Sequence, residues 1–298
     1  MEAIGRQYIV FPSRSTEFRL WNLADLHLGN RGVALDKLKT DLREIERDPF
    51  SFWLGGGDYA EYISPSDIKR WDASCVSGDI KVSDLGNLGR VLTGKVRDLF
   101  KPIKHKCLGL AFGNHEDKYA IQKEQQDLHA WLCQELGVPN LGYSAFLDVA
   151  FCRVTGAGRP KSPELWRMTP EGLSPLVQGN STIEAVKRIF VHHGAGAAQS
   201  SGGKLNRLVA FMMSHDADIY FLGHIHDQVA KRVTALTTDA TCTKILQRDR
   251  VGIVTGSYLR TYTQGVTGYG EKKGYAPVPL GARFVRVNTG TGEVRAEV

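Results

Sequence analysis

Histidine, aspartate and asparagine side chains follow five apolar runs of this sequence, at the point where each run ends. The five strings are Asp25-Leu26-His27, Gly57-Asp58, Gly113-Asn114-His115-Glu116, His192-His193 and Gly223-His224-Ile225-His226. Polar groups crowded at the ends of buried strands must be hydrated, paired or bound to a metal. Six of the nine histidines lie in these strings. Their joint occurrence therefore predicts a metal site.

The residue types indicate which metals and which chemistry. Imidazoles mixed with carboxylates and an amide oxygen suit transition ions such as Mn, Zn, Fe or Ni better than calcium. Two ions ~3.5–4 Å apart can clamp the attacking and leaving oxygens of a phosphoryl transfer, and one aspartate can bridge them. Each string alone has a plainer explanation, such as a helix cap or a histidine pair near the surface. The five together favour a two-metal centre.

Apolar runs predict strands over residues 18–24, 50–54, 107–112, 186–191 and 218–222, each ending at one of the strings. We expect the strings to converge, because ligand sites of α/β sheets lie beyond the carboxyl ends of the strands. Other patterns predict helices over 33–47, 119–136 and 204–214, and a helical stretch over 64–101 that its glycines divide into two or more helices. They also predict a hairpin or strand pair over 143–155 and antiparallel strands after residue 229. A single domain, 1–298, is expected. Its proline-rich stretch at about 156–182 is an irregular insertion, either solvated or a lid.

Composition restricts the class of protein. The 298 residues are 42% hydrophobic and 23% charged, which is ordinary for a globular protein. No run of ~18 apolar residues exists, so we expect no membrane span. The five cysteines show no Cys-x-x-Cys spacing, which predicts a reducing, cytoplasmic location. A net charge of +6 permits attraction of phosphate-bearing substrates.

The five strings, in this order, resemble the motifs of the calcineurin-like metallophosphoesterases. The resemblance runs from residue 25 to residue 226 and implies an α/β fold, a four-layer αββα sandwich of two mixed sheets with flanking helices. It implies two divalent transition-metal ions, with Mn favoured and Zn, Fe or Ni as alternatives. It also assigns roles to the residues of the strings: Asp25, His27 and His226 hold one ion, Asn114, His192 and His224 hold the other, Asp58 bridges them, and His115 is the catalytic acid or charge stabiliser. His193 stays open as the alternative to His192, and Glu116 and Asp117 are expected at a helix start or behind the ligands.

Departures from the family bear on the substrate. Protein phosphatases of this family carry arginines in Gly-Asp-x-x-Asp-Arg-Gly and just before Gly-Asn-His-Glu. Here the matching stretches are 57–62 and 111–113, and neither contains an arginine. The resemblance therefore favours the phosphodiesterase and DNA-repair nuclease branch, in which a metal-bridging hydroxide attacks a phosphodiester of a nucleotide, DNA or RNA. A phosphomonoesterase, with Arg159 or Arg167 as a substitute clamp, and a non-catalytic scaffold are the alternatives.

Overall fold

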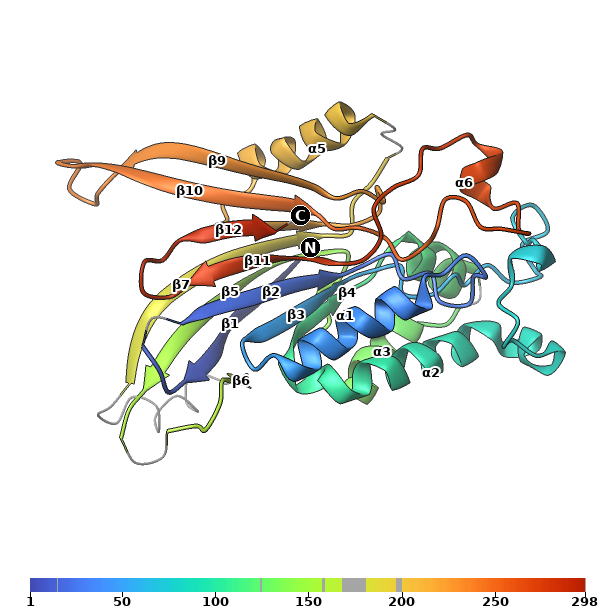
Figure 1. Cartoon of the computed structure of the whole chain (residues 1–298), viewed down its shortest axis with the longest axis horizontal. Helices are drawn as coiled ribbons and strands as arrows, with labels where there is room; N and C mark the ends of the chain where they lie inside the picture. The colour runs from blue at the N-terminus through green and yellow to red at the C-terminus, as the bar shows by residue number, and fades with distance from the viewer. Residues whose placement is uncertain (15, 124, 157–158, 168–180, 197–199, 298) are drawn as a thin grey trace.

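Two mixed β-sheets form the centre of the protein (Figure 1). The computed structural model describes all residues except 15, 124, 157–158, 168–180, 197–199 and 298. Within that part of the chain, one sheet has the strand order β6-β1-β5-β7-β8-β10-β9 and the other β12-β11-β2-β3-β4. The first sheet comprises β1 (Glu2–Phe11), β5 (Ser144–Val154), β6 (Glu164–Trp166), β7 (Ser181–His192), β8 (Ile219–Leu222), β9 (Val229–Thr238) and β10 (Ile245–Val254). The second comprises β2 (Glu17–Leu23), β3 (Ser51–Gly56), β4 (Cys107–Ala111), β11 (Arg283–Asn288) and β12 (Val294–Glu297).

The two sheets pack face to face through a core of branched and aromatic side chains. Phe18 of β2 lies at the centre, with its ring centroid 5.1 Å from that of Phe11 and 5.0 Å from that of Phe151. Val191 and Phe221 enter the same core from β7 and β8. Alternate residues of a strand point to opposite faces, so the other face of each sheet needs its own cover.

Helices provide that cover. They are α1 (Leu35–Arg47), α2 (Leu88–Phe100), α3 (Leu128–Leu136) and α5 (Ser201–Ser214). The short α6 (Tyr269–Lys272) has no buried residue and does not contribute to this cover. The first three pack on the outer face of the five-stranded sheet around Trp53, and α5 packs on the seven-stranded sheet through Leu208 and Met212. The predicted αββα sandwich is thereby confirmed. Among the described helices, none is both long and apolar enough to cross a membrane.

The carboxyl ends of five strands meet at one end of the sandwich. Strands β2, β3 and β4 are parallel neighbours in one sheet, and β7 and β8 are parallel neighbours in the other. Backbone bonds then tie the loops together: Asp25 N–H donates to the Gly57 carbonyl at 2.9 Å, and Gly223 N–H donates to the His193 carbonyl at 3.0 Å. The packing of the two sheets thus sets the positions of all five strings.

Some predicted elements differ from the structure. In the stretch 64–101, only α2 is a regular α-helix; Ala73–Cys75 and Val82–Asn87 are short 3-10 turns. Pro65 and the glycines before residue 88 interrupt the helical backbone there. The predicted helix 119–136 is divided into a π-helix, Glu116–Lys123, and α3, which begins at an Asp127 cap. The predicted strand pair 143–155 is the single long β5, and β1 was not predicted.

The predicted insertion at about 156–182 lies only partly among the described residues. Its part 164–166 is β6, which pairs antiparallel with β1, and β7 already begins at Ser181. Residues 157–158 and 168–180 of the insertion lie outside the described part of the chain. Arg167 bonds the carbonyl oxygens of Cys107 and Gly137, at the amino end of β4 and therefore away from the strand ends where the strings meet. This placement removes Arg167 as a substitute phosphate clamp.

His129 of α3 is a buried histidine of the core, outside the five strings. Burial lowers its pKa to about 4. Its Nε2 lies 3.1 Å from the Leu110 carbonyl and 3.1 Å from Asn140 Oδ1. Each of these oxygens also accepts a backbone N–H, from Leu141 and Gly142 respectively. Removing the imidazole therefore leaves neither acceptor without a partner.

We predict that His129 makes folding sensitive to acid. A folded-state pKa of about 4 against an unfolded value near 6.5 favours the folded state fully above pH ~6.5, and this stability is lost as the pH falls toward 4. Relative to His129→Phe, the wild type should lose about 2 kcal/mol between pH 7.5 and pH 5. Urea unfolding of both proteins at the two pH values measures this difference in the free energy of unfolding. An equal loss in both would contradict the assignment.

Candidate metal centre

Loops that follow β2, β3, β4, β7 and β8 bring the motif side chains into one cluster. Among the eight described non-glycine residues with positive φ, five belong to the strings: Asp25 (53°), His27 (49°), Asp58 (52°), His224 (67°) and His226 (41°). The left-handed region is unfavourable for side chains with a Cβ, although Asp and His tolerate it better than most residues. Such conformations concentrate at functional sites, where the surroundings hold them in place.

Asp25, His27 and His226 form the first group of donor atoms, and their ligand atoms lie within 4.8 Å of one another. The Nε2 atoms of the two imidazoles are 3.2 Å apart, and His226 Nε2 is 3.3 Å from Asp25 Oδ1. The other Asp25 oxygen accepts the backbone N–H of His224 at 2.8 Å. This is the trio that the sequence analysis placed around one ion.

Asp58, His193 and His224 form the second group, again within 4.8 Å. His193 Nδ1 donates to the Gly56 carbonyl at 2.7 Å, so its Nε2 faces Asp58 Oδ2 at 3.3 Å and Asn114 Oδ1 at 3.2 Å. Asp58 also groups with His27 and His115. Its carboxylate therefore stands between the two trios, as expected for a bridging residue.

The structure brings His193 into the cluster and leaves His192 outside it. His192 Nδ1 accepts the Gly194 N–H at 2.7 Å, and its ring packs 4.7 Å from that of Phe211 on the α5 side of the sheet. Burial lowers the pKa of His192 to about 4, with His193 adding to the effect. The sequence-based preference for His192 is corrected in this geometry, because adjacent residues at the end of β7 point to opposite faces.

His115 lies beside the two groups, edge-on to His27 with ring centroids 4.7 Å apart. Its backbone N–H donates to Asp58 Oδ1 at 2.8 Å. Its Nδ1 is 2.5 Å from the backbone carbonyl of Glu61, which can only accept a hydrogen bond, so Nδ1 carries a proton. This contact leaves Nε2 as the ring nitrogen available to a substrate.

Sequence reasoning missed Glu61. Its carboxylate lies 3.4 Å from His27 Nδ1 and accepts the Asn30 amide at 3.1 Å. Burial opposes its ionisation, but the neighbouring imidazoles of His27 and His115 outweigh burial and lower the pKa of Glu61 to about 2. A signal was present, since Glu61 stands where the family motif Gly-Asp-x-x-Asp has its second acidic residue.

Glu116 binds backbone rather than histidine. Its buried carboxylate accepts three N–H groups, from Gly113 at 2.8 Å, Asp58 at 2.9 Å and Tyr59 at 2.8 Å. These bonds lock the loop after β4 to the loop after β3. Burial and the nearby Asp58 charge raise the pKa of Glu116 to about 7. Asp117 accepts the side chain of Gln122 instead and lies at the start of the π-helix.

The buried carboxylates of Asp58 and Asp25 carry negative charge that a bound cation would stabilise. Burial disfavours the Asp58 anion, but His193 and His115 outweigh burial and hold the pKa of Asp58 well below its usual value. Asp58 in turn raises the pKa of His193 to about 10 against the effect of burial. Asp25 Oδ1 is buried without a hydrogen-bond partner. An orphaned carboxylate oxygen facing imidazole nitrogens is the donor arrangement that divalent metals occupy, so the residues fit the metals that the motifs imply.

Comparison with known proteins identifies the family of this chain. The model of the family described as calcineurin-like phosphoesterases matches residues 18–228, and the chain belongs to this family. A search of the curated proteins finds no match.

Two solved structures are similar over most of their length. One is a double mutant of Vps29 from Entamoeba histolytica, 11% identical with a TM-score of 0.36, over 94% of this chain and 97% of that one. The other is a conserved uncharacterized protein, a predicted phosphoesterase, from Streptococcus pneumoniae, 11% identical with a TM-score of 0.30, over 95% and 98%. Likeness of this degree bears on neither the substrate nor the partners of this chain.

We predict that Glu116→Gln destabilises the fold and the centre together. The amide retains one acceptor oxygen but turns an NH₂ group toward one of the three backbone donors. A buried donor left without its acceptor costs about 1–3 kcal/mol. Asp117→Asn is the matched control and should change the free energy of unfolding by less than about 0.5 kcal/mol. Urea unfolding of the two variants measures the loss of unfolding free energy. Equal losses would contradict the role given to the three backbone hydrogen bonds of Glu116.

Proposed function

We propose that this protein is a dinuclear metal-dependent hydrolase of phosphodiester bonds, acting on nucleotides or nucleic acid. Asp25, His27 and His226 would hold one ion; Asn114, His193 and His224 the other, with Asp58 between them. Two such ions supply an activated water and neutralise charge on the phosphoryl oxygens. Mn is the favoured metal, as the mixed nitrogen and oxygen donor set suggests. The five cysteines, free in the structure, support a reducing, cytoplasmic location.

The observation that carries the diester preference is that neither of the two motif positions that hold arginine in the family's protein phosphatases does so here. The position after Glu61, where the family's protein phosphatases have arginine, is Tyr62. A phosphomonoester near neutral pH carries close to two negative charges and a diester carries one. A site without the two arginines therefore suits the diester.

His115 is placed to assist the leaving group. The Glu61 carbonyl fixes its Nδ1, so its Nε2 can present a proton to the ester oxygen that departs. Lys204, a nearby cation on α5, is paired with the carboxylate of Asp227 at 3.1 Å. This pair carries no net charge, and it therefore adds no clamp for a dianion.

We predict a metal-content difference between the two adjacent histidines. His193→Ala removes a donor that faces Asp58 and Asn114, so the purified protein should lose about one of two Mn ions per chain. His192→Ala removes a ring that packs on Phe211 and should keep both ions. Elemental analysis after Mn loading measures this directly. If only the His192 variant lost metal, His192 rather than His193 would be the ligand, as the sequence analysis preferred.

The proposed function is tested with a matched substrate pair. With Mn, kcat/KM for methyl p-nitrophenyl phosphate should exceed that for p-nitrophenyl phosphate, because the diester needs less charge compensation. Protein stripped by a chelator serves as the control and should be inactive until Mn is restored. A monoester preference of tenfold or more, about 1.4 kcal/mol in the transition state, would refute the diester proposal. Inactivity on both substrates with two bound ions would favour a scaffold.

A further inference from the structure

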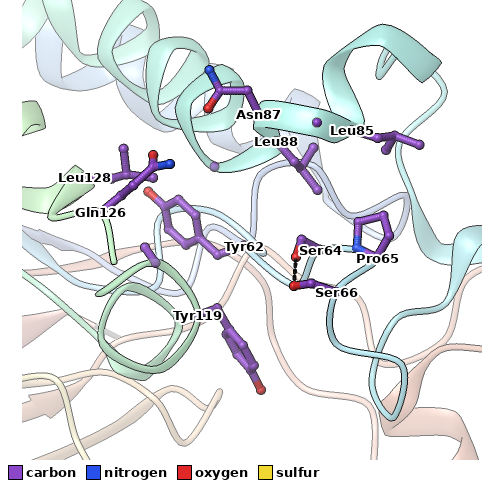
Figure 2. Close-up of a pocket in the computed structure, with 13 residues that line it drawn as sticks. Tyr62, Ser64, Pro65, Ser66, Leu85, Asn87, Leu88, Tyr119, Gln126 and Leu128 are labelled. Carbon is purple, nitrogen blue, oxygen red and sulfur yellow. Dashed lines mark hydrogen bonds between the residues drawn. The ribbon is translucent and has the colours of Figure 1, made fainter. Parts of the chain in front are cut away.

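A cavity of about 220 Å³ lies next to the candidate metal centre, between the amino end of α2 and the π-helix (Figure 2). Tyr62, Leu88, Tyr119 and Leu128 give it an aromatic and aliphatic lining. Tyr119 connects the cavity with the centre, because its ring lies edge-on to His115 with centroids 5.1 Å apart. A group in this cavity would therefore be next to the side chain that assists the leaving group.

Two of the residues that line the cavity carry amide side chains. Asn87 and Gln126 both line it, and both residues are exposed to solvent. An amide offers a donor and an acceptor side by side, which complements the edge of a nucleobase. Buried rings together with exposed amides suit a flat heteroaromatic ring with a polar edge.

The backbone at this cavity is held in an unfavourable conformation. Tyr62 has a φ of 53°, which is rare for a bulky residue, and its hydroxyl is fixed by Thr93 Oγ1 at 3.0 Å. Gln125, directly before Gln126, has a φ of 52°. Outside the metal cluster only these two residues and Cys242 share this feature among the described non-glycine residues. Strain of this kind is retained where a ligand is bound more often than elsewhere.

Positive charge lies on the side of Tyr119. Arg70 and Lys123 approach its ring, at 6.0 Å and 5.2 Å from the centroid, and both pair with the single carboxylate of Asp67. Two cations with one anion leave a net positive charge at this edge. That charge would favour a further phosphate of a polynucleotide next to the cavity.

We propose that this cavity is a subsite for one nucleobase, on the leaving-group side of the scissile phosphodiester. The inference rests on the proposed function and narrows its substrate to nucleotides and single-stranded nucleic acid. The volume is below the ~300–1,000 Å³ of sites that enclose a drug-sized ligand, so it accommodates one ring system and leaves the sugar and phosphate outside. A base within a duplex cannot enter without unstacking.

The test uses two dinucleotides that differ only in the base on the leaving side, adenine in one and an abasic site in the other. With Mn-loaded wild type, kcat/KM for the adenine dinucleotide should be at least tenfold higher, as stacking and burial of a base allow. Chromatography of the products gives both rates. Equal rates on the two dinucleotides would overturn the subsite.

Four variants separate the subsite from general effects on the fold. In Gly89→Ala the new Cβ lies 2.7 Å from the end of Leu128 and must displace that side chain. Both residues line the cavity, so its shape changes and the adenine-to-abasic ratio should fall toward one. Gly94→Ala, on the same helix with open space around its Cβ, should keep the ratio. Tyr119→Leu should lower the ratio and Tyr119→Phe should keep it. The proposal would be contradicted if the adenine-to-abasic ratio fell equally in Gly89→Ala and Gly94→Ala, or equally in Tyr119→Leu and Tyr119→Phe.

A binding measurement tests the subsite independently of the hydrolytic reaction. Free adenosine has no phosphate, so its binding does not depend on hydrolysis. Calorimetry should detect adenosine binding to the wild type and to Gly94→Ala, and binding at least tenfold weaker to Gly89→Ala. If neither dinucleotide is hydrolysed while adenosine still binds in this pattern, the proposed function fails and the subsite stands. If both dinucleotides are hydrolysed at equal rates and adenosine does not bind, the subsite is refuted and the proposed function stands.

Discussion

The buried carboxylate of Asp58 is the constraint on which the rest of the centre depends. Its side chain is almost fully removed from solvent. An isolated buried charge would cost more than the whole stability of a typical domain, so the surroundings must compensate for it. His193 faces one oxygen and the backbone N–H of His115 bonds the other. Glu116 holds the Asp58 backbone from behind, which prevents the carboxylate from turning toward water.

This arrangement requires that two sheets meet closely at their carboxyl ends. Asp58 comes from the five-stranded sheet and His193 from the seven-stranded sheet, so the packing of the core around Phe18 sets the distance between them. Glycine permits the approach. A Cβ on Gly57, whose φ is 93°, would lie 2.7 Å from His193 Nδ1 and 2.5 Å from the Gly113 nitrogen. Even an alanine at position 57 would force the two loops apart.

The sequence predicted the parts of this account that depend on local pattern. Apolar runs that stop at metal-ligand residues indicated five strand ends, and the αββα architecture was implied by the resemblance of the five strings to the motifs of the family. The choice between His192 and His193 could not be made in this way. Phe190 packs toward α5 and Val191 toward the other sheet, so both faces of β7 are buried and an apolar pattern does not distinguish them.

Other features depended on contacts that are distant in sequence. The motif position of Glu61 was a signal for it, but its contacts with His115, through the carbonyl, and with His27, through the carboxylate, appear only in the folded chain. The cavity between Tyr62 and Tyr119 is likewise lined by residues of the segments 64–101 and 119–136, which the sequence analysis assigned to helices. Glycines and Pro65 made the first of these segments irregular, and that irregular backbone forms one wall of the cavity.

Electron paramagnetic resonance of the Mn-loaded protein tests the central claim, that Asp58 stands between two ions, most directly. The wild type should bind two Mn per chain and give a spin-coupled spectrum, because ions bridged by one carboxylate lie ~3.5–4 Å apart. The coupling should disappear in Asp58→Asn. One Mn per chain, or two ions whose spectrum shows no coupling in the wild type, would contradict a centre organised around Asp58.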